Sequence, residues 1–78
     1  MIGVMATITV KEEKEKEFQE IMKKLVIAVN LNEEDNLFYR LYKKSPFIYV
    51  VLEGYKNREA LQNHTKTDHY KKYGKAMA

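Results

Sequence analysis

Apolar residues along this chain alternate in some segments, as in strands, and recur every three or four residues in others, as in helices. The order of these segments limits the possible folds more than any other feature of the sequence. Residues 2–10 alternate and carry β-branched side chains, which predicts a strand. Residues 12–29 repeat apolar side chains at helical spacing and predict an amphipathic helix. The apolar stripe of this helix is Phe18, Ile21, Met22, Leu25 and Val29. Residues 30–36 are polar and predict a loop.

The middle of the chain predicts a β-hairpin. Residues 37–44 and 47–55 both alternate, and Lys44-Ser45-Pro46 lies at their junction. Proline suits a turn position because its φ angle is already fixed near the required value. Two strands joined by so short a connection are expected to pair in an antiparallel manner.

The last segment, residues 56–78, predicts two short helices. Asn57 is a natural N-cap, and Thr67 is a second one. Asp68 follows in the first turn of the second helix, where a carboxylate suits the helix dipole. We therefore expect a break in the helix near residues 65–67.

The resulting order, β-α-β-β-α, predicts one α+β domain over residues 1–78, with helices on one face of an antiparallel sheet. It is the ferredoxin-like order without its last strand. A chain of 78 residues buries only a small core, and the absence of cysteine excludes disulfides. Apolar residues also occur on the second face of the sheet. A face-to-face homodimer, forming a dimeric barrel, would bury them and add stability.

Composition argues against two classes of partner. No apolar run approaches the roughly 20 residues that span a bilayer, and the N-terminal segment does not read as a signal peptide, so we expect a cytoplasmic protein. The net charge of +3 and the absence of a known motif do not favour nucleic acid. Residues 56–78 carry six basic and two acidic side chains, a surplus of 6 − 2 = +4, which can attract an anion or simply form a solvated helix face.

The segment LEGYKNREALQNHTKTDHY, residues 52–70, resembles the antibiotic biosynthesis monooxygenase family. The matching positions are Glu53, Tyr55, Asn57, Glu59, Ala60, Leu61, His64, Thr67, His69 and Tyr70. Upstream, DNLFYRLYK is similar to the family's Gly-Cys-x-x-Tyr strand, with Tyr39 at the tyrosine, and VMATITVKEEKEKEF is similar to its first strand and helix. The resemblance covers nearly the whole chain, which departs from the family by lacking the usual last strand.

The resemblance implies a dimeric α+β barrel that oxidises polycyclic phenols or quinols with O2 and uses no metal or flavin. Such chemistry needs a base for the phenolic proton, an apolar pocket and a group that stabilises the developing anion. It implies no cofactor. His-x4-His across a helix break is also not a trusted metal-ligand spacing, so we predict no metal site.

Three residues are the catalytic candidates. His64 is the first candidate for the base because histidine has an unperturbed pKa near neutrality. His69 is either a second hydrogen-bonding group or the base itself. Glu53 is expected either to orient a histidine or to pair with Arg40. The candidate substrate-binding residues come from both strand faces, because the sequence does not show which face meets the cavity; they are Tyr39, Tyr49, Tyr55, Phe38 and Arg40.

Each candidate also has a structural interpretation. His64 can be a half-buried helix residue, His69 a capping residue, and the tyrosines core or dimer interface. These interpretations favour a second function: a non-catalytic dimeric barrel that binds a small hydrophobic molecule or serves as an association module. A fold alone does not choose between the two.

Overall fold

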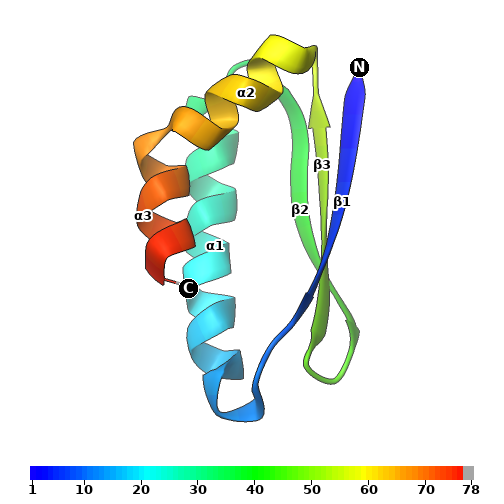
Figure 1. Cartoon of the computed structure of the whole chain (residues 1–78), viewed down its shortest axis with the longest axis vertical. Helices are drawn as coiled ribbons and strands as arrows, with labels where there is room; N and C mark the ends of the chain where they lie inside the picture. The colour runs from blue at the N-terminus through cyan, green and yellow to red at the C-terminus, as the bar shows by residue number, and fades with distance from the viewer. Residues whose placement is uncertain (77–78) are drawn as a thin grey trace.

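The protein forms two layers, a three-stranded antiparallel sheet and a layer of helices on one of its faces (Figure 1). The structure is a computed structural model that describes residues 1–76. The predicted α+β class is confirmed. The elements are β1 (Ile2–Thr9), a 3₁₀ helix (Glu12–Lys14), α1 (Glu15–Asn32), β2 (Asn36–Ser45), β3 (Ile48–Tyr55), α2 (Arg58–Lys66) and α3 (Asp68–Ala76).

The strand order is β1-β3-β2, so β3 is central and pairs with both of its neighbours. Glu53 on β3 lies opposite Val4 on β1 and Tyr39 on β2. Side chains directly opposite each other in an antiparallel pair lie on the same face. Glu53 and Tyr39 are both buried, which identifies this face as the one that the helices cover. The register therefore places a carboxylate in the middle of the helix-covered face.

Helix α1 supplies most of the apolar core, as its spacing predicts. Phe18, Met22, Leu25 and Val29 are buried, and Ile21 is half-buried. The prediction that the helix ends at residue 29 is wrong, because α1 continues through residue 32 and only then leaves the helical conformation.

Local hydrogen bonds explain the longer helix. The Asn32 side chain donates to the carbonyl of Ala28 (2.8 Å), and the backbone N–H of Glu33 donates to the carbonyl of Val29 (3.0 Å). After Val29 the helix adds no residue to its apolar stripe, so in sequence the last turn looks like a loop. The extra turn makes Glu33 the C-cap residue of α1.

The hairpin turn lies one residue later than predicted. Ser45 pairs with Ile48, so Pro46 and Phe47 are the two turn residues. Phe47, which alternation assigns to the strand, has a φ of 64°. A second turn position with positive φ usually carries glycine. Here the carbonyl of Phe47 accepts a hydrogen bond from the N–H of Val10 (2.8 Å), which helps to hold the turn.

Both predicted N-caps are confirmed. The side-chain oxygen of Asn57 accepts from the N–H of Ala60 (2.9 Å). The hydroxyl of Thr67 accepts from the N–H of Tyr70 (3.2 Å) and donates to the carbonyl of His64 (2.7 Å). The break at Thr67 lets α3 run beside α1, while α2 leads from the sheet into the helix layer (Figure 1).

The outer face of the sheet carries apolar side chains that no helix covers. Met5 is 71% exposed and Tyr42 is 46% exposed. The ring of Phe38 lies against Gly54, where a Cβ atom would come within 2.2 Å of it. Within residues 1–76, none of the helices has the length and apolar character needed to cross a membrane.

Candidate active site

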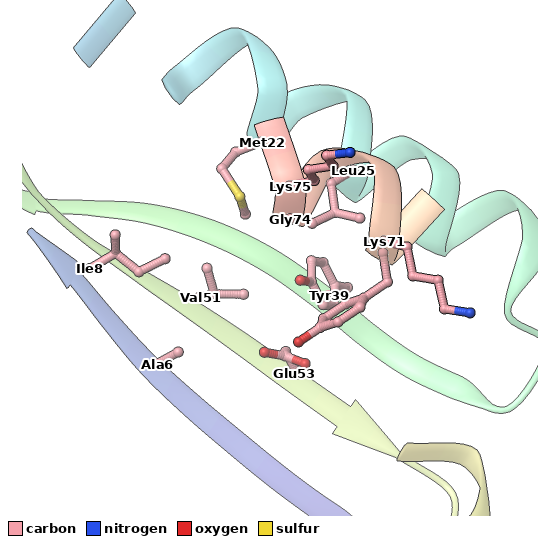
Figure 2. Close-up of a pocket in the computed structure, with 11 residues that line it drawn as sticks. Ala6, Ile8, Met22, Leu25, Tyr39, Val51, Glu53, Lys71, Gly74 and Lys75 are labelled. Atoms are coloured by element: carbon pink, nitrogen blue, oxygen red, sulfur yellow. The ribbon is translucent and has the colours of Figure 1, made fainter. Parts of the chain in front are cut away.

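A cavity of about 440 Å³ lies between the helix-covered face of the sheet and helices α1 and α3 (Figure 2). This volume is within the range that small-molecule sites occupy. Its wall is apolar at one end, where Ile8, Val51 and Met22 gather in Figure 2, whereas Tyr39 and Glu53 lie toward the other. The lining residues are Ala6, Ile8, Met22, Leu25, Tyr39, Val51, Glu53, Tyr70, Lys71, Gly74 and Lys75.

The position of the cavity follows from how the two layers meet. The inward side chains of edge strand β1 are only half-buried, whereas Val51 on the central strand is buried. Ala6 lies opposite Val51 in the sheet, and its small side chain leaves space beneath the helices. The space therefore extends along the β1 side of the helix layer.

Glu53 is the carboxylate that reaches the cavity. Its side chain is 11% exposed. The hydroxyl of Tyr55 donates to Oε1 of Glu53 (2.6 Å), and Nε2 of His64 lies 3.9 Å from the same oxygen. The Tyr55 hydroxyl is a donor that stabilises the buried carboxylate, and it engages only one of the two carboxylate oxygens. The second oxygen remains available to a molecule in the cavity.

Tyr39 places a hydroxyl in the same end of the cavity. The residue is 5% exposed, and within residues 1–76 its hydroxyl has no hydrogen-bond partner. Burial raises the pKa of Tyr39 strongly, and the negative charges of Glu53 and Glu33 raise it further. The hydroxyl therefore stays protonated and can donate a hydrogen bond to a bound molecule.

His64 lies behind Glu53 and does not line the cavity. It is 2% exposed, and the rings of Tyr39, Tyr55 and Tyr70 surround it at centroid distances of 5.3, 5.5 and 5.0 Å. Its Nδ1 lies 2.9 and 2.8 Å from the two carboxylate oxygens of Glu33. A carboxylate only accepts, so Nδ1 carries the proton and Nε2 is directed toward Glu53.

Glu33 also binds the second histidine. Nε2 of His69 donates to Oε2 of Glu33 at 2.5 Å. Three elements meet here, since Glu33 caps α1, His64 lies in the last turn of α2 and His69 in the first turn of α3. The two histidines lie on different helices, and both nevertheless bind the same carboxylate.

Among residues 1–76, the same three residues form a set whose chemistry suits a divalent metal. One nitrogen from each histidine and a carboxylate oxygen of Glu33 all lie within 4.8 Å of one another. Two histidines and one carboxylate form a known ligand set for transition metals. The prediction of no metal site rested on the family resemblance and on the histidine spacing, and it did not include Glu33, which lies 31 residues before His64.

Residues 1–76 match the antibiotic biosynthesis monooxygenase family. The chain belongs to this family. It is similar to the solved structure of a candidate antibiotic biosynthesis monooxygenase from Caulobacter crescentus CB15, with 39% identity and a TM-score of 0.90 over 96% of this chain and 73% of that one. It is also similar to a conserved protein from Methanosarcina mazei Go1, with 34% identity and a TM-score of 0.88 over 96% of this chain and 75% of that one. No curated protein matches the chain.

Membership of the antibiotic biosynthesis monooxygenase family assigns the chain to a general class of monooxygenase-like proteins and confirms the resemblance inferred from residues 52–70. Of the residues that carried it, Glu53, Tyr55, His64, His69 and Tyr70 lie together around one end of the cavity.

Two predicted substrate-binding tyrosines face the helices without lining the cavity. Tyr55 is completely buried and donates to Glu53. Tyr49 lies toward the opposite end of β3, where its hydroxyl donates to Glu15 (2.9 Å) and accepts from Gln19 (2.6 Å). Both tyrosines are buried in the core and do not line the cavity.

Phe38 and Arg40 lie on the outer face of the sheet, because they alternate with the inward Tyr39. The expected ion pair between Arg40 and Glu53 is therefore wrong: Arg40 is exposed on the other side of the sheet, where its guanidinium lies 5.9 Å from the centroid of the Phe38 ring. Neither residue can reach the cavity within one chain.

Sequence reasoning missed three groups of this site. Glu33 lies in the acidic run Glu33-Glu34-Asp35, where nothing local distinguishes it from its neighbours. Lys71 and Lys75 line the cavity from α3. Their spacing of four residues within the basic segment 56–78 is a signal that they share one helix face.

Proposed function

We propose that this protein is a cofactor-independent monooxygenase that oxidises a quinol-like or polycyclic phenolic substrate with O2. One observation carries the proposal: a cavity with an apolar end contains a buried carboxylate, Glu53, beside a protonated phenol, Tyr39. A flat aromatic ring fits the apolar wall, and the two polar groups meet its oxygen substituent.

The reaction begins with removal of the phenolic proton by Glu53. The electron-rich anion gives one electron to O2, and the resulting radical pair combines to form a C–O bond at a ring carbon that carries hydrogen. The peroxide takes back the proton that Glu53 holds. Loss of the ring hydrogen as a second proton, with cleavage of the O–O bond, then releases water and leaves a carbonyl. The balance is phenol plus O2 to quinone plus H2O, so one oxygen atom enters the substrate and no further reductant is needed.

Each residue has a distinct role in this scheme. Glu53 is the catalytic base, because its free oxygen faces the cavity. Tyr39 donates a hydrogen bond to the oxygen on which negative charge develops. His64 acts through Glu53 as a positioning residue and can share the proton that Glu53 accepts, since its Nε2 lies 3.9 Å away. His69 acts one step further back, through Glu33.

The test is O2 uptake with a panel of naphthols, naphthoquinols and anthrones, without added metal or flavin. We expect uptake above the spontaneous rate for the wild type and loss of at least 100-fold in Glu53→Gln, in keeping with removal of a general base. Glu20→Gln, which changes an exposed carboxylate on α1, is the control and should keep full activity. Uptake in Glu53→Gln equal to that of the control would refute the assignment.

We also propose that the protein is a homodimer that associates through the outer face of its sheet. The apolar residues of this face support the proposal, since exposed apolar surface next to polar surface is typical of association sites. Met5 and Tyr42 are exposed members of this face. Light scattering should give twice the chain mass of 9.3 kDa, and Met5→Glu combined with Tyr42→Glu should give the monomer mass. A wild-type monomer at micromolar concentration would contradict the proposal.

A further inference from the structure

We infer that the same cavity catalyses an O2-independent reaction, the tautomerisation of a cyclic aryl ketone by proton transfer at the carbon next to its carbonyl. This inference shares with the proposed function the role of Glu53 as base, but it does not depend on any reaction with O2. It names the class of activity that a base and a neutral donor perform when no oxidant is present.

The first observation is the unpaired hydroxyl of Tyr39. The ring of this residue is buried, and within the described residues its hydroxyl has no hydrogen-bond partner at the edge of the cavity. Within the described residues no buried polar side-chain atom lacks a partner, so this unpaired hydroxyl is accessible from the cavity, where a ligand can supply the acceptor. A ketone oxygen is such an acceptor, and its demand for a hydrogen bond increases as it becomes an enolate.

The second observation is the position of Glu53 relative to this hydroxyl. Glu53 and Tyr39 are directly opposed on neighbouring strands and face the same cavity. Opposed side chains have Cβ atoms about 5 Å apart. The hydrogen of a ketone's α-carbon and the carbonyl oxygen are also close neighbours within one molecule. One carboxylate and one tyrosine held in this way can therefore engage both atoms of the same substrate.

The chemical step needs no other reactant. Glu53 takes the proton from the α-carbon, the C–H electron pair becomes a carbon–carbon double bond, and the carbonyl electron pair moves to oxygen, which Tyr39 stabilises. The protonated Glu53 then returns the proton to the enolate oxygen or to another carbon of the conjugated system. Substrate and product are isomers, so atoms and electrons balance.

The wall of the cavity limits the substrate class. Ile8, Met22 and Val51 offer only hydrocarbon and thioether surface, and they lie away from the two polar groups (Figure 2). A ketone fused to an aromatic ring places its flat apolar part against this wall. An aliphatic polyhydroxy ketone would bury unpaired hydroxyl groups there.

The experiment is hydrogen–deuterium exchange at the α-carbon of 2-tetralone and of anthrone, followed by proton NMR in D2O under strictly anaerobic conditions. We expect the wild type to accelerate exchange above the buffer rate, and Tyr39→Phe to reduce the acceleration by about 100-fold, as removal of one oxyanion donor does. Tyr39→Phe keeps the buried ring and removes only a hydroxyl without a protein partner, so it should fold. Glu20→Gln, at an exposed position of α1 outside the cavity and the outer face of the sheet, is the control.

The outcomes separate this inference from the proposed function. Exchange that depends on Tyr39 without any O2 uptake supports the tautomerase and refutes the monooxygenase. O2 uptake without anaerobic exchange supports the monooxygenase and refutes the tautomerase. Exchange that is equal in the wild type, Tyr39→Phe and buffer alone overturns the inference.

Discussion

Replacing Glu33 with glutamine should have a large effect on stability, although the residue does not touch the cavity. Its carboxylate accepts from Nδ1 of His64 (2.8 and 2.9 Å) and from Nε2 of His69 (2.5 Å), and its side chain is 10% exposed. A hydrogen bond to a charged group contributes about 1.5–3 kcal/mol. Loss of the charge weakens two such interactions, so we expect Glu33→Gln to reduce the free energy of unfolding by about 3 kcal/mol.

The assay is thermal unfolding followed by circular dichroism. In a domain of this size each kcal/mol corresponds to about 4–8 °C, so the melting temperature should fall by about 12–24 °C. Glu34→Gln removes the same charge from the next, exposed residue and should change the melting temperature by less than about 2 °C. If the two variants melt at the same temperature, the shared carboxylate does not hold the helix junction together, and the reasoning is refuted.

Three further perturbations test other parts of the structure. Burial raises the pKa of Tyr39 and Tyr55 above the ordinary value of 10. Above about pH 10 the unfolded chain releases these two protons while the folded chain keeps them, so the free energy of unfolding should fall as the pH rises further. Urea unfolding midpoints at increasing pH measure this. Gly54→Ala should destabilise by about 1–3 kcal/mol, because its Cβ would lie 2.2 Å from the Phe38 ring, and urea unfolding will show whether it does. Asn57→Ala removes an N-cap and should reduce the free energy of unfolding by about 1 kcal/mol in the same assay.

Local patterns were sufficient for most of the fold. Alternation placed β1 and the hairpin, the spacing from Phe18 to Val29 placed α1, and Asn57 and Thr67 located both later helix starts. These signals are encoded within a few neighbouring residues. The two errors also have local causes, since polar residues extended α1 on its exposed side and Phe47 occupies a turn conformation that usually requires glycine.

The candidate site was predictable only in part. Alternation shows that Phe38 and Arg40 lie opposite to Tyr39, but aromatic residues occur on both faces, so the sequence does not show which face the helices cover. Glu33 and His64 are 31 residues apart, and Glu33 and His69 are 36 apart. Their contact depends on the end of α1, the break at Thr67 and the packing of α3 together, and no local pattern contains that information.

The charges behind the cavity are difficult to explain by stability alone. A domain of 78 residues has a small core, yet this one places Glu33, Glu53 and His64 in the space between its layers. Burial of charged groups is expensive, and apolar residues of similar volume often stabilise a protein as well or better. Half-buried surface elsewhere, along β1, could have accommodated the polar groups at lower cost.

The arrangement of these groups is directional, and this favours chemistry over simple stabilisation. Glu33 fixes the proton on Nδ1 of His64, Nε2 of His64 faces Glu53, and one oxygen of Glu53 faces the cavity beside the hydroxyl of Tyr39. A cluster that only joined helices to the sheet would have no reason to end at a cavity with one free acceptor and one free donor. A carboxylate and a histidine that contact each other beside a cavity are typical of sites that move protons. Proton transfer is the step common to the monooxygenase and the tautomerase, and it is therefore the function that this arrangement of residues supports most directly.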